Sequence, residues 1–371
     1  MNSLKKKVKT DQMDLSISEL VNMYLRGVLD IHPEFQRLFR WSENQKSRFI
    51  ESILLGIPIP PIFVAEDKKS AYDVIDGVQR LSTIFEFMGI LKDEQNNKVP
   101  PSILTGTEKV PALEGKVWDH SVYKHKFAFT DDEAIENKFL YSSKFRIIRI
   151  ENDSDDDVKY DIFNRLNTGA SRLSNQEIRN CLAIMLNRDF YKWMRMLSRK
   201  IDFITCIPLS ERNISEQADL EYVLRFLVYR YINRNEYSYS DEMDQILTRK
   251  MKYFCKFDCI NYKKEEEIFC KTFELLSIAL GGNSFKKYDV KSGIFKGQVL
   301  MSVFEIVAIG IANNIDEITK LKDPIEFIKV KTKSLYQDHK YLELQSKKIN
   351  SQRAVTRFTV LTEFGTKYFK P

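Results

Sequence analysis

The sequence predicts an α+β protein, with a small mixed sheet and helices followed by an all-helical domain. In the first half of the chain, short β-branched runs bounded by turn residues alternate with helical patterns. Beyond about residue 190, strand-like runs become scarce and long helical patterns dominate. The length of 371 residues also exceeds the usual size of a single core. We therefore expect two domains, residues 1–190 and 191–371.

Capping and turn residues place most of the individual elements. Ser42-x-x-Gln45 and Ser174-x-x-Glu177 are capping boxes that open helices, and Gly56 is suited to end the first of them. The expected elements are a helix capped by Ser16 or Ser18 and ending near Arg26, a helix from Ser42 to Leu55, strands at 62–65 and 72–75, a helix from Gln79 to about Ile90, an irregular insertion or lid at 91–130, a strand at 144–150, a helix from Ser174 to about Leu186, and helices at 215–233, 240–255, 263–280, 297–313 and 323–340.

The composition is typical of a cytoplasmic protein. Hydrophobic residues make up 43% of the chain and charged residues 30%, and no apolar run reaches the roughly 18 to 20 residues of a membrane span. The N-terminal residues 1–7 lack the apolar core of a signal peptide. Five cysteines without regular spacing fit a reducing compartment. We expect a cytoplasmic location and no membrane contact.

The stretch from Tyr72 to Thr83 is the strongest candidate for a functional site. A β-branched run ends at Asp76-Gly77, a turn pair, and helical spacing follows it. A helix start after a glycine turn presents free N–H groups and a positive dipole end to an anion. Arg80, one turn into the helix, would add a forked partner for phosphate. The alternative is an ordinary turn between strand and helix with a solvated arginine.

Positive charge gathers near the C-terminus. The net charge of the chain is +6. Residues 320–371 contain 12 Lys and Arg against 5 Asp and Glu, a balance of +7. Such a region is compatible with nucleic acid contact. A lysine-rich helical surface in solvent would produce the same count.

No metal site is assigned from the sequence. The acidic run Asp153–Asp157 could bind a divalent cation, but a serine followed by three aspartates is also typical of a helix N-terminus, which we favour. Cys255, Cys259 and Cys270 are too widely spaced for a zinc knuckle. The chain contains neither a P-loop nor an H-E-x-x-H motif.

Four ordered motifs carry a family resemblance over residues 31–180. The motifs are His32-Pro-Glu-Phe-Gln-Arg37 with Trp41, Gly56-Ile-Pro-Ile-Pro-Pro61, Asp76-Gly-Val-Gln-Arg-Leu-Ser-Thr83, and Phe163-Asn-Arg-Leu-Asn-Thr-Gly169 with Leu173 and Gln176-Glu-Ile-Arg179. They resemble the N-terminal domain of GmrSD-type (type IV) restriction enzymes, a ParB/sulfiredoxin-like domain with a D-G-Q-Q-R motif. The helical second half of that domain would cover the rest of the chain.

The resemblance implies a nucleotide site in the first domain. It assigns catalytic roles to Asp76, Gln79 and Arg80, and nucleotide binding to Gln36, Arg37, Gly77, Thr83, Arg165 and Asn167. The implied cofactors are a nucleoside triphosphate and Mg²⁺. Val78 replaces the first glutamine of the motif, Ser82 a threonine, and Ala170 the second glycine of the fourth motif. The loss of one glutamine weakens the expectation of hydrolysis more than that of binding.

The resemblance also implies a role in DNA restriction or phage defence. The related enzymes add a C-terminal HNH nuclease, whose chemistry needs histidine, and His339 is the only histidine in the second half of this chain. We therefore expect an NTP-binding and NTP-hydrolysing sensor or regulatory protein without its own HNH nuclease. Its expected partners are a nucleotide, DNA, a separate nuclease subunit and further copies of the chain. The alternatives are a non-enzymatic, nucleotide-gated DNA clamp and a nuclease acting through the ParB-like domain.

Overall fold

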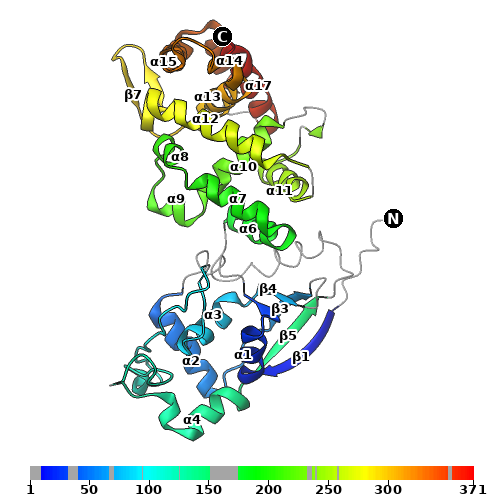
Figure 1. Cartoon of the computed structure of the whole chain (residues 1–371), viewed down its shortest axis with the longest axis vertical. Helices are drawn as coiled ribbons and strands as arrows, with labels where there is room; N and C mark the ends of the chain where they lie inside the picture. Colours follow the sequence, from blue (N-terminus) through cyan, green and yellow to red (C-terminus); the bar gives the residue numbers. More distant parts are fainter. Residues whose placement is uncertain are drawn as a thin grey trace. The chain divides into compact units, whose positions relative to one another are not determined.

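The chain divides into two compact units, each described here by itself. In the computed structural model, unit 1 is Met1–Arg172 and unit 2 is Leu173–Pro371 (Figure 1). The structure describes residues 10–31, 41–66, 71–93, 95–124, 126–150, 174–231, 236–238, 240–256, 259–349 and 353–371. The helix α6 (Asn175–Leu186), which the sequence analysis groups with the first domain, falls in unit 2.

Unit 1 is built on a five-stranded mixed sheet with the strand order β1-β5-β3-β4-β2. The outer pair β1–β5 and the inner pair β3–β4 are antiparallel, whereas β3–β5 and β2–β4 are parallel. This arrangement confirms the expected mixed sheet. The strands are β1 (Thr10–Ser16), β2 (Leu29–Asp30), β3 (Ile62–Glu66), β4 (Tyr72–Asp76) and β5 (Lys144–Ile150).

The edge strand β1 was not predicted from the sequence. Its residues, TDQMDLS, are mostly polar and exposed, so they carry no clear strand pattern. All seven residues pair with β5, from Thr10 opposite Ile150 to Ser16 opposite Lys144. The pairing with a neighbouring strand, and not local propensity, therefore determines this element.

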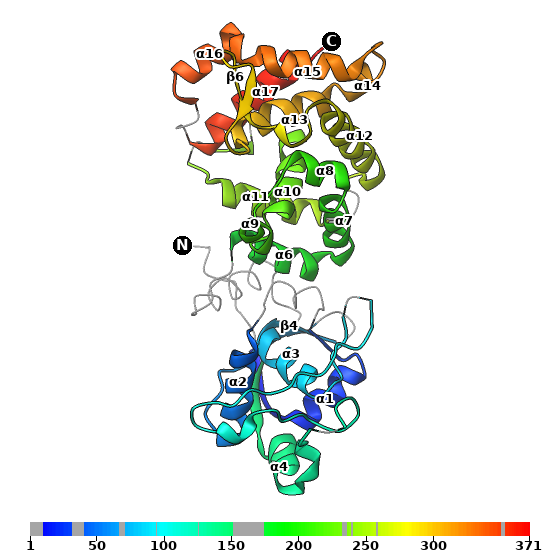
Figure 2. The ribbon, with the colours of Figure 1, turned by 90° about the vertical axis from the view of Figure 1, so that its left-hand side faces the viewer.

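Two helices of unit 1, α1 (Ile17–Leu25) and α2 (Glu43–Leu55), begin where the capping patterns predict. The described part of the unit also contains α3 (Val78–Phe87) and the short α4 (Glu133–Asn137), followed by a π turn at Lys138–Ser142 (Figure 2). Ser16 and Ser42 each cap their helix in a complete capping box. Gly56 ends α2 in the left-handed conformation. The apolar side of α3, formed by Leu81, Ile84 and Phe85, is fully buried.

The irregular insertion at 91–130 is anchored in the core of unit 1. It contains only the 3₁₀ turn Pro111–Leu113 and the start of a second, Phe129–Asp131, among its described residues. The ring of Trp118 lies 6.0 Å from Phe87 of α3, and the Thr105 amide donates to Ser47 Oγ of α2 over 2.9 Å. These contacts make the insertion part of the packed domain.

Unit 2 is mostly helical. Its helices are α6 (Asn175–Leu186), α7 (Arg188–Ser198), α8 (Ile201–Cys206), α9 (Glu211–Ser215), α10 (Ala218–Arg230), α11 (Met243–Phe254), α12 (Tyr262–Leu280), α13 (Met301–Asn313), α14 (Ile315–Ile318), α15 (Pro324–Ser334), α16 (His339–Ser346) and α17 (Ala354–Tyr368), with 3₁₀ turns at Gly281–Asn283 and Leu335–Gln337. A two-stranded hairpin, β6 (Lys287–Asp289) and β7 (Ile294–Lys296), is its one departure, within the described residues, from the all-helical domain expected. The five helices predicted from periodicity correspond to α10, α11, α12, α13 and α15, but the last ends at Ser334 and not at residue 340. The 15-residue helix α17 was not predicted.

Two glycines allow the closest helix crossing in unit 2, between α13 and α17. A Cβ atom on Gly365 would lie 2.2 Å from the carbonyl oxygen of Ile306, and one on Gly310 would lie 2.5 Å from the carbonyl oxygen of Gly365. Side chains at either position would force the helices apart.

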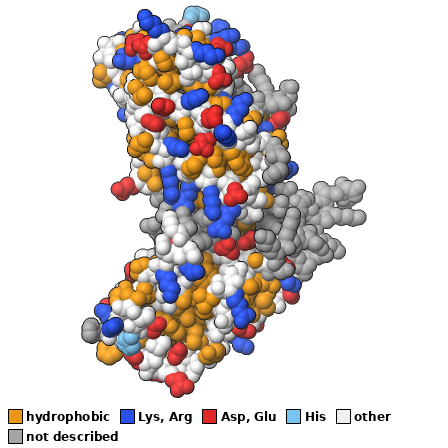
Figure 3. Space-filling model, in the orientation of Figure 1, with side chains coloured by type: hydrophobic (Ala, Val, Ile, Leu, Met, Phe, Trp, Pro, Cys, Tyr) orange, Lys and Arg blue, Asp and Glu red, His pale blue; other side chains and the backbone are white. Residues whose placement is uncertain are grey.

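The surface of unit 2 carries charged side chains of both signs on the face drawn in Figure 3. Hydrophobic side chains are visible on the same face of unit 1. No helix among the described residues is long and apolar enough to cross a membrane.

Candidate functional site

The turn between β4 and α3 has the geometry that the sequence predicts. Gly77 has a φ of +102°, and a Cβ atom there would lie 2.8 Å from the side chain of Ile62. The position therefore requires glycine. The helix α3 begins at Val78, one residue earlier than predicted, and no side chain among the described residues caps its N-terminus. Its first-turn N–H groups and positive dipole end thus favour an anion at this turn.

Arg80 connects this turn to the loop before β3. Its Nη2 donates to Asp76 Oδ2 over 2.7 Å, and its Nη1 donates to the carbonyl oxygens of Pro60 and Pro61, the latter over 3.2 Å. The Arg80 side chain is 12% exposed, whereas that of Asp76 is 43% exposed. The expectation of a solvated arginine is therefore wrong, because Arg80 is held on two sides by the protein.

Burial and charge act in opposite directions on the Arg80 guanidinium. Burial lowers the pKa of Arg80 below its ordinary value, although the negative charge and the hydrogen bond of Asp76 raise it. The net direction is downward, so Asp76 compensates only part of the cost of burying the cation. A bound anion at this position would supply further compensation.

Gln79 joins a second distant segment to the same turn. Its Oε1 accepts a hydrogen bond of 3.1 Å from the backbone N–H of Trp41, the last residue of the first motif. Pro60 and Pro61, which Arg80 binds, end the second motif. Consecutive side chains of the third motif therefore hold the ends of the first two motifs together.

Thr83 lies within the packed part of α3. Its side chain is 2% exposed, and its hydroxyl donates to the carbonyl of Gln79 over 2.7 Å. The assignment of Thr83 to nucleotide binding stays a prediction, and its hydroxyl is bound here within the helix. The neighbouring Ser82 hydroxyl is buried and has no hydrogen-bond partner within the described part of the chain.

Four residues of the predicted site lie outside the described residues. They are Gln36 and Arg37 from the first motif, and Arg165 and Asn167 from the fourth. Their convergence on Arg80 stays a prediction. The acidic run Asp153–Asp157 is also outside the described residues.

The ion pair between α2 and α3 was not predicted from the sequence. Lys46 Nζ lies 2.7 Å from Glu86 Oε1 and 2.9 Å from Glu43 Oε1. Its side chain is largely shielded from solvent, as is that of Glu86. Lys46 and Glu86 are 40 positions apart, so no local pattern could indicate their contact.

The end of the fourth motif builds a different centre in unit 2. Arg179 of α6 is 1% exposed, and its guanidinium lies 2.8 Å from both Glu221 of α10 and Asp244 of α11. Its Nε donates to Gln176 Oε1 over 2.8 Å. With both acids and an amide bound, Arg179 fastens three helices together and has a structural role.

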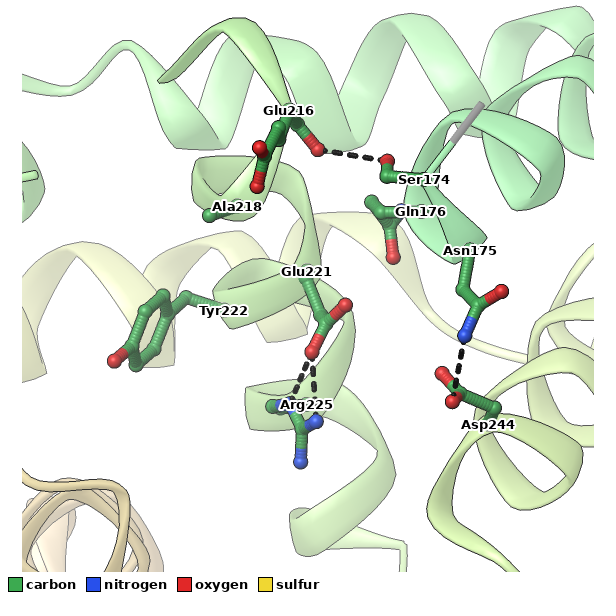
Figure 4. A pocket seen from close by; sticks show the side chains of 9 residues that line it. All are labelled: Ser174, Asn175, Gln176, Glu216, Ala218, Glu221, Tyr222, Arg225 and Asp244. Atoms are coloured by element: carbon green, nitrogen blue, oxygen red, sulfur yellow. Dashed lines mark hydrogen bonds and ion pairs between the residues drawn. The ribbon is translucent and has the colours of Figure 1, made fainter. Parts of the chain in front are cut away.

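A polar pocket of about 320 Å³ lies beside this centre (Figure 4). It is lined by Ser174, Asn175, Gln176, Glu216, Ala218, Glu221, Tyr222, Arg225 and Asp244. Its acids have partners inside the protein: Glu221 also binds Arg225 at 2.6 Å, and Asp244 accepts from Asn175 over 2.7 Å. Among the described residues, no cluster of three or more His, Cys, Asp or Glu side chains is arranged to hold a metal ion.

The comparison with known families agrees with the motifs. Residues 17–184 match the GmrSD restriction endonuclease, N-terminal domain. No curated protein and no solved structure matches the chain. The matched segment runs from α1 to α6 and thus includes Asp76, Gln79 and Arg80 as well as Arg179. Residues 17–184 are therefore similar to the GmrSD restriction endonuclease N-terminal domain.

Proposed function

We propose that this chain is an NTP-binding and NTP-hydrolysing regulatory protein of a DNA restriction or phage-defence system, without its own HNH nuclease. The family of residues 17–184 supports the role in restriction. The observation that carries the nucleotide site is the uncapped N-terminus of α3, with Arg80 fixed beside it by Asp76 and by the carbonyl groups of Pro60 and Pro61.

The donor set fits a phosphate group. Backbone N–H groups at a helix start and a guanidinium are the two partners that anions most often find in proteins. Gly77 provides the positive φ of this turn, which leaves no room for a Cβ beside Ile62 and Arg80. Gln36, Arg37, Arg165 and Asn167 would complete the phosphate shell from the first and fourth motifs.

Asp76 is the residue that fits a nucleotide-bound Mg²⁺. Its Oδ2 is bound to Arg80, but its side chain is 43% exposed, so the carboxylate keeps acceptor capacity. Mg²⁺ is commonly bound through one or two carboxylates and the phosphates of the nucleotide. When bound, it would neutralise phosphate charge. The role of Asp76 is to hold Arg80 in place and to orient water or the metal ion.

A nucleotide-gated DNA clamp is the second candidate. Two features of the motif favour it: Val78 stands where the family has glutamine, and Gln79 Oε1 is already bound to the Trp41 amide. Both reduce the number of polar groups available to position a water molecule. In this alternative, nucleotide binding without hydrolysis would switch the protein between two conformations.

Thermal unfolding of the full chain with each of the four NTPs and Mg²⁺ tests binding. A ligand present at 100 times its Kd stabilises the native state by about 2.7 kcal/mol, so one nucleotide should raise the Tm by several degrees. Arg80→Ala should abolish this shift, because it removes the forked contact. The control is Arg146→Ala, an exposed arginine of β5, which should retain the shift. An unchanged Tm with all four NTPs would contradict the proposal.

Phosphate release, with and without DNA, separates the enzyme from the clamp. Asp76→Ala should reduce turnover more than binding, since a carboxylate repels phosphate and serves catalysis through water or metal. Gln79→Glu keeps an acceptor for the Trp41 amide but removes the amide donor, so turnover should fall while stability is retained. Binding without phosphate release in the unmodified protein would favour the clamp. A gain of turnover in Val78→Gln would then show that this substitution had silenced hydrolysis.

A further inference from the structure

The β6–β7 hairpin of unit 2 is a basic surface that neither the motifs nor the nucleotide site uses. It appears beside the helices of unit 2 in Figures 1 and 2. Residues 283–300 contain four lysines and one aspartate. The hairpin lies outside the basic region at 320–371 that the sequence analysis singled out.

The lysines of the hairpin are left with little compensating charge. Lys287 lies directly opposite Lys296 in the strand register, and like charges in such a pair are destabilising. Asp289 binds Lys296 over 2.6 Å, and that hydrogen bond, with one from Ser292, holds the pKa of Asp289 well below its usual range. Lys287 and Lys291 are exposed and form no ion pair with any residue that the structure describes.

Aromatic contacts hold the hairpin firmly against α15 and the turn after it. The ring of Tyr288 lies 4.9 Å from Phe295 and 6.5 Å from Tyr336. The Tyr336 hydroxyl donates to the carbonyl of Lys286 over 3.0 Å. Lys333 of α15 places its Nζ 5.8 Å from the Tyr288 ring, which adds a fifth cation to the hairpin surface. These contacts fix the position of the hairpin backbone that carries the lysines.

We propose that this hairpin binds duplex DNA through the phosphate backbone. A two-stranded ribbon fits the major groove, which is about 12 Å wide. Four positions separate Lys287 from Lys291, a span of at most about 13 Å at the rise of a strand. Lysines at the base and tip of the ribbon could thus reach phosphates on both sides of the groove. The inference deepens the proposed role in restriction and rests on it for the choice of DNA over another polyanion.

DNA binding by the full chain carrying Lys287→Ala and Lys291→Ala tests this inference. Fluorescence anisotropy with a 20-base-pair duplex, over a series of salt concentrations, gives the affinity and its salt dependence. Each lost phosphate contact lowers the slope of log K against log salt by about 0.9. The double variant should therefore lose about 2 from the slope and bind at least about tenfold more weakly at low salt.

Lys320→Ala with Lys322→Ala is the matched control, because both lysines are exposed and removal of the pair changes the net charge equally. It should keep the slope of the unmodified chain. Equal losses in both double variants would overturn the hairpin as the binding surface. Poly-glutamate bound as tightly as the duplex would overturn DNA in favour of an acidic polypeptide. A nucleotide-induced rise in Tm that persists in the hairpin variant leaves the proposed function standing even if DNA binding fails.

Discussion

Arg80 in unit 1 and Arg179 in unit 2 both lie in family motifs and both are shielded from solvent, but their surroundings differ. Arg179 is 1% exposed and faces two carboxylates, Glu221 and Asp244. Arg80 is 12% exposed and faces one carboxylate, the half-exposed Asp76, and two carbonyl oxygens. Arg179 therefore has two carboxylate partners, one of which, Glu221, is shared with Arg225, whereas Arg80 has one.

This difference separates a structural arginine from a candidate ligand-binding one. A buried cation that already has two acids gains little from another anion. Burial lowers the pKa of Arg80 despite Asp76, so an anion would be favourable there. Motif membership alone does not distinguish the two roles, since Gln176-Glu-Ile-Arg179 and Asp76–Thr83 both belong to the matched domain. The charge around each guanidinium does.

Arg179→Ala should give the largest loss of stability. It removes the 1%-exposed side chain that joins Glu221 and Asp244. Glu221 keeps Arg225 and Asp244 keeps Asn175, so we expect a loss of about 3 kcal/mol, the lower end of the cost of breaking a buried ion pair. Urea unfolding followed by circular dichroism measures the effect on unit 2. Arg212→Ala, which removes an exposed pair with Glu216, should leave the midpoint nearly unchanged. A loss from Arg179→Ala no greater than from Arg212→Ala would break the comparison, because Arg179 would then not be a structural centre.

Gly77→Ala should have the next largest effect and should act on the Arg80 site. A positive φ disfavours alanine, and the new Cβ would lie 2.8 Å from Ile62 and 3.3 Å from Arg80 Nη2. We expect a loss of about 2–3 kcal/mol together with loss of the nucleotide-induced Tm shift. Gly56→Ala is the matched control: its φ is +69° but nothing lies within 4 Å of the added atom. It should cost only about 1 kcal/mol and keep the shift.

Ser82→Ala should have the smallest effect, with the opposite sign. The buried Ser82 hydroxyl has no partner within the described residues, so its removal should stabilise unit 1 by up to about 1 kcal/mol. Differential scanning calorimetry of the nucleotide-free protein measures this gain. If Ser82→Ala instead weakens nucleotide binding, this hydroxyl contacts the ligand, and the nucleotide site includes Ser82 as well as Arg80.

Local sequence signals determined most of the elements and the position of the candidate site. The capping boxes at Ser42 and Ser174 and the glycine at position 77 act through hydrogen bonds and backbone angles within a few residues. Such signals can be read without knowledge of the rest of the fold. The same holds for α10, α11, α12, α13 and α15, which periodicity predicts, but not for α17, which was missed. The polar edge strand β1 and the short hairpin of unit 2 had no such pattern, because each depends on pairing with another strand.

The tertiary structure alone decided what the motif residues contact. Gln79 meets the Trp41 amide 38 positions away, and Arg80 meets Pro60 and Pro61 about 20 positions away. Arg179 meets Glu221 and Asp244 at separations of 42 and 65. The sequence by itself determined that these polar residues are present at helix starts and on helix faces. Folding brings together the charges that neutralise some of these residues and not others. The spacing of residues along the chain does not indicate which charges meet.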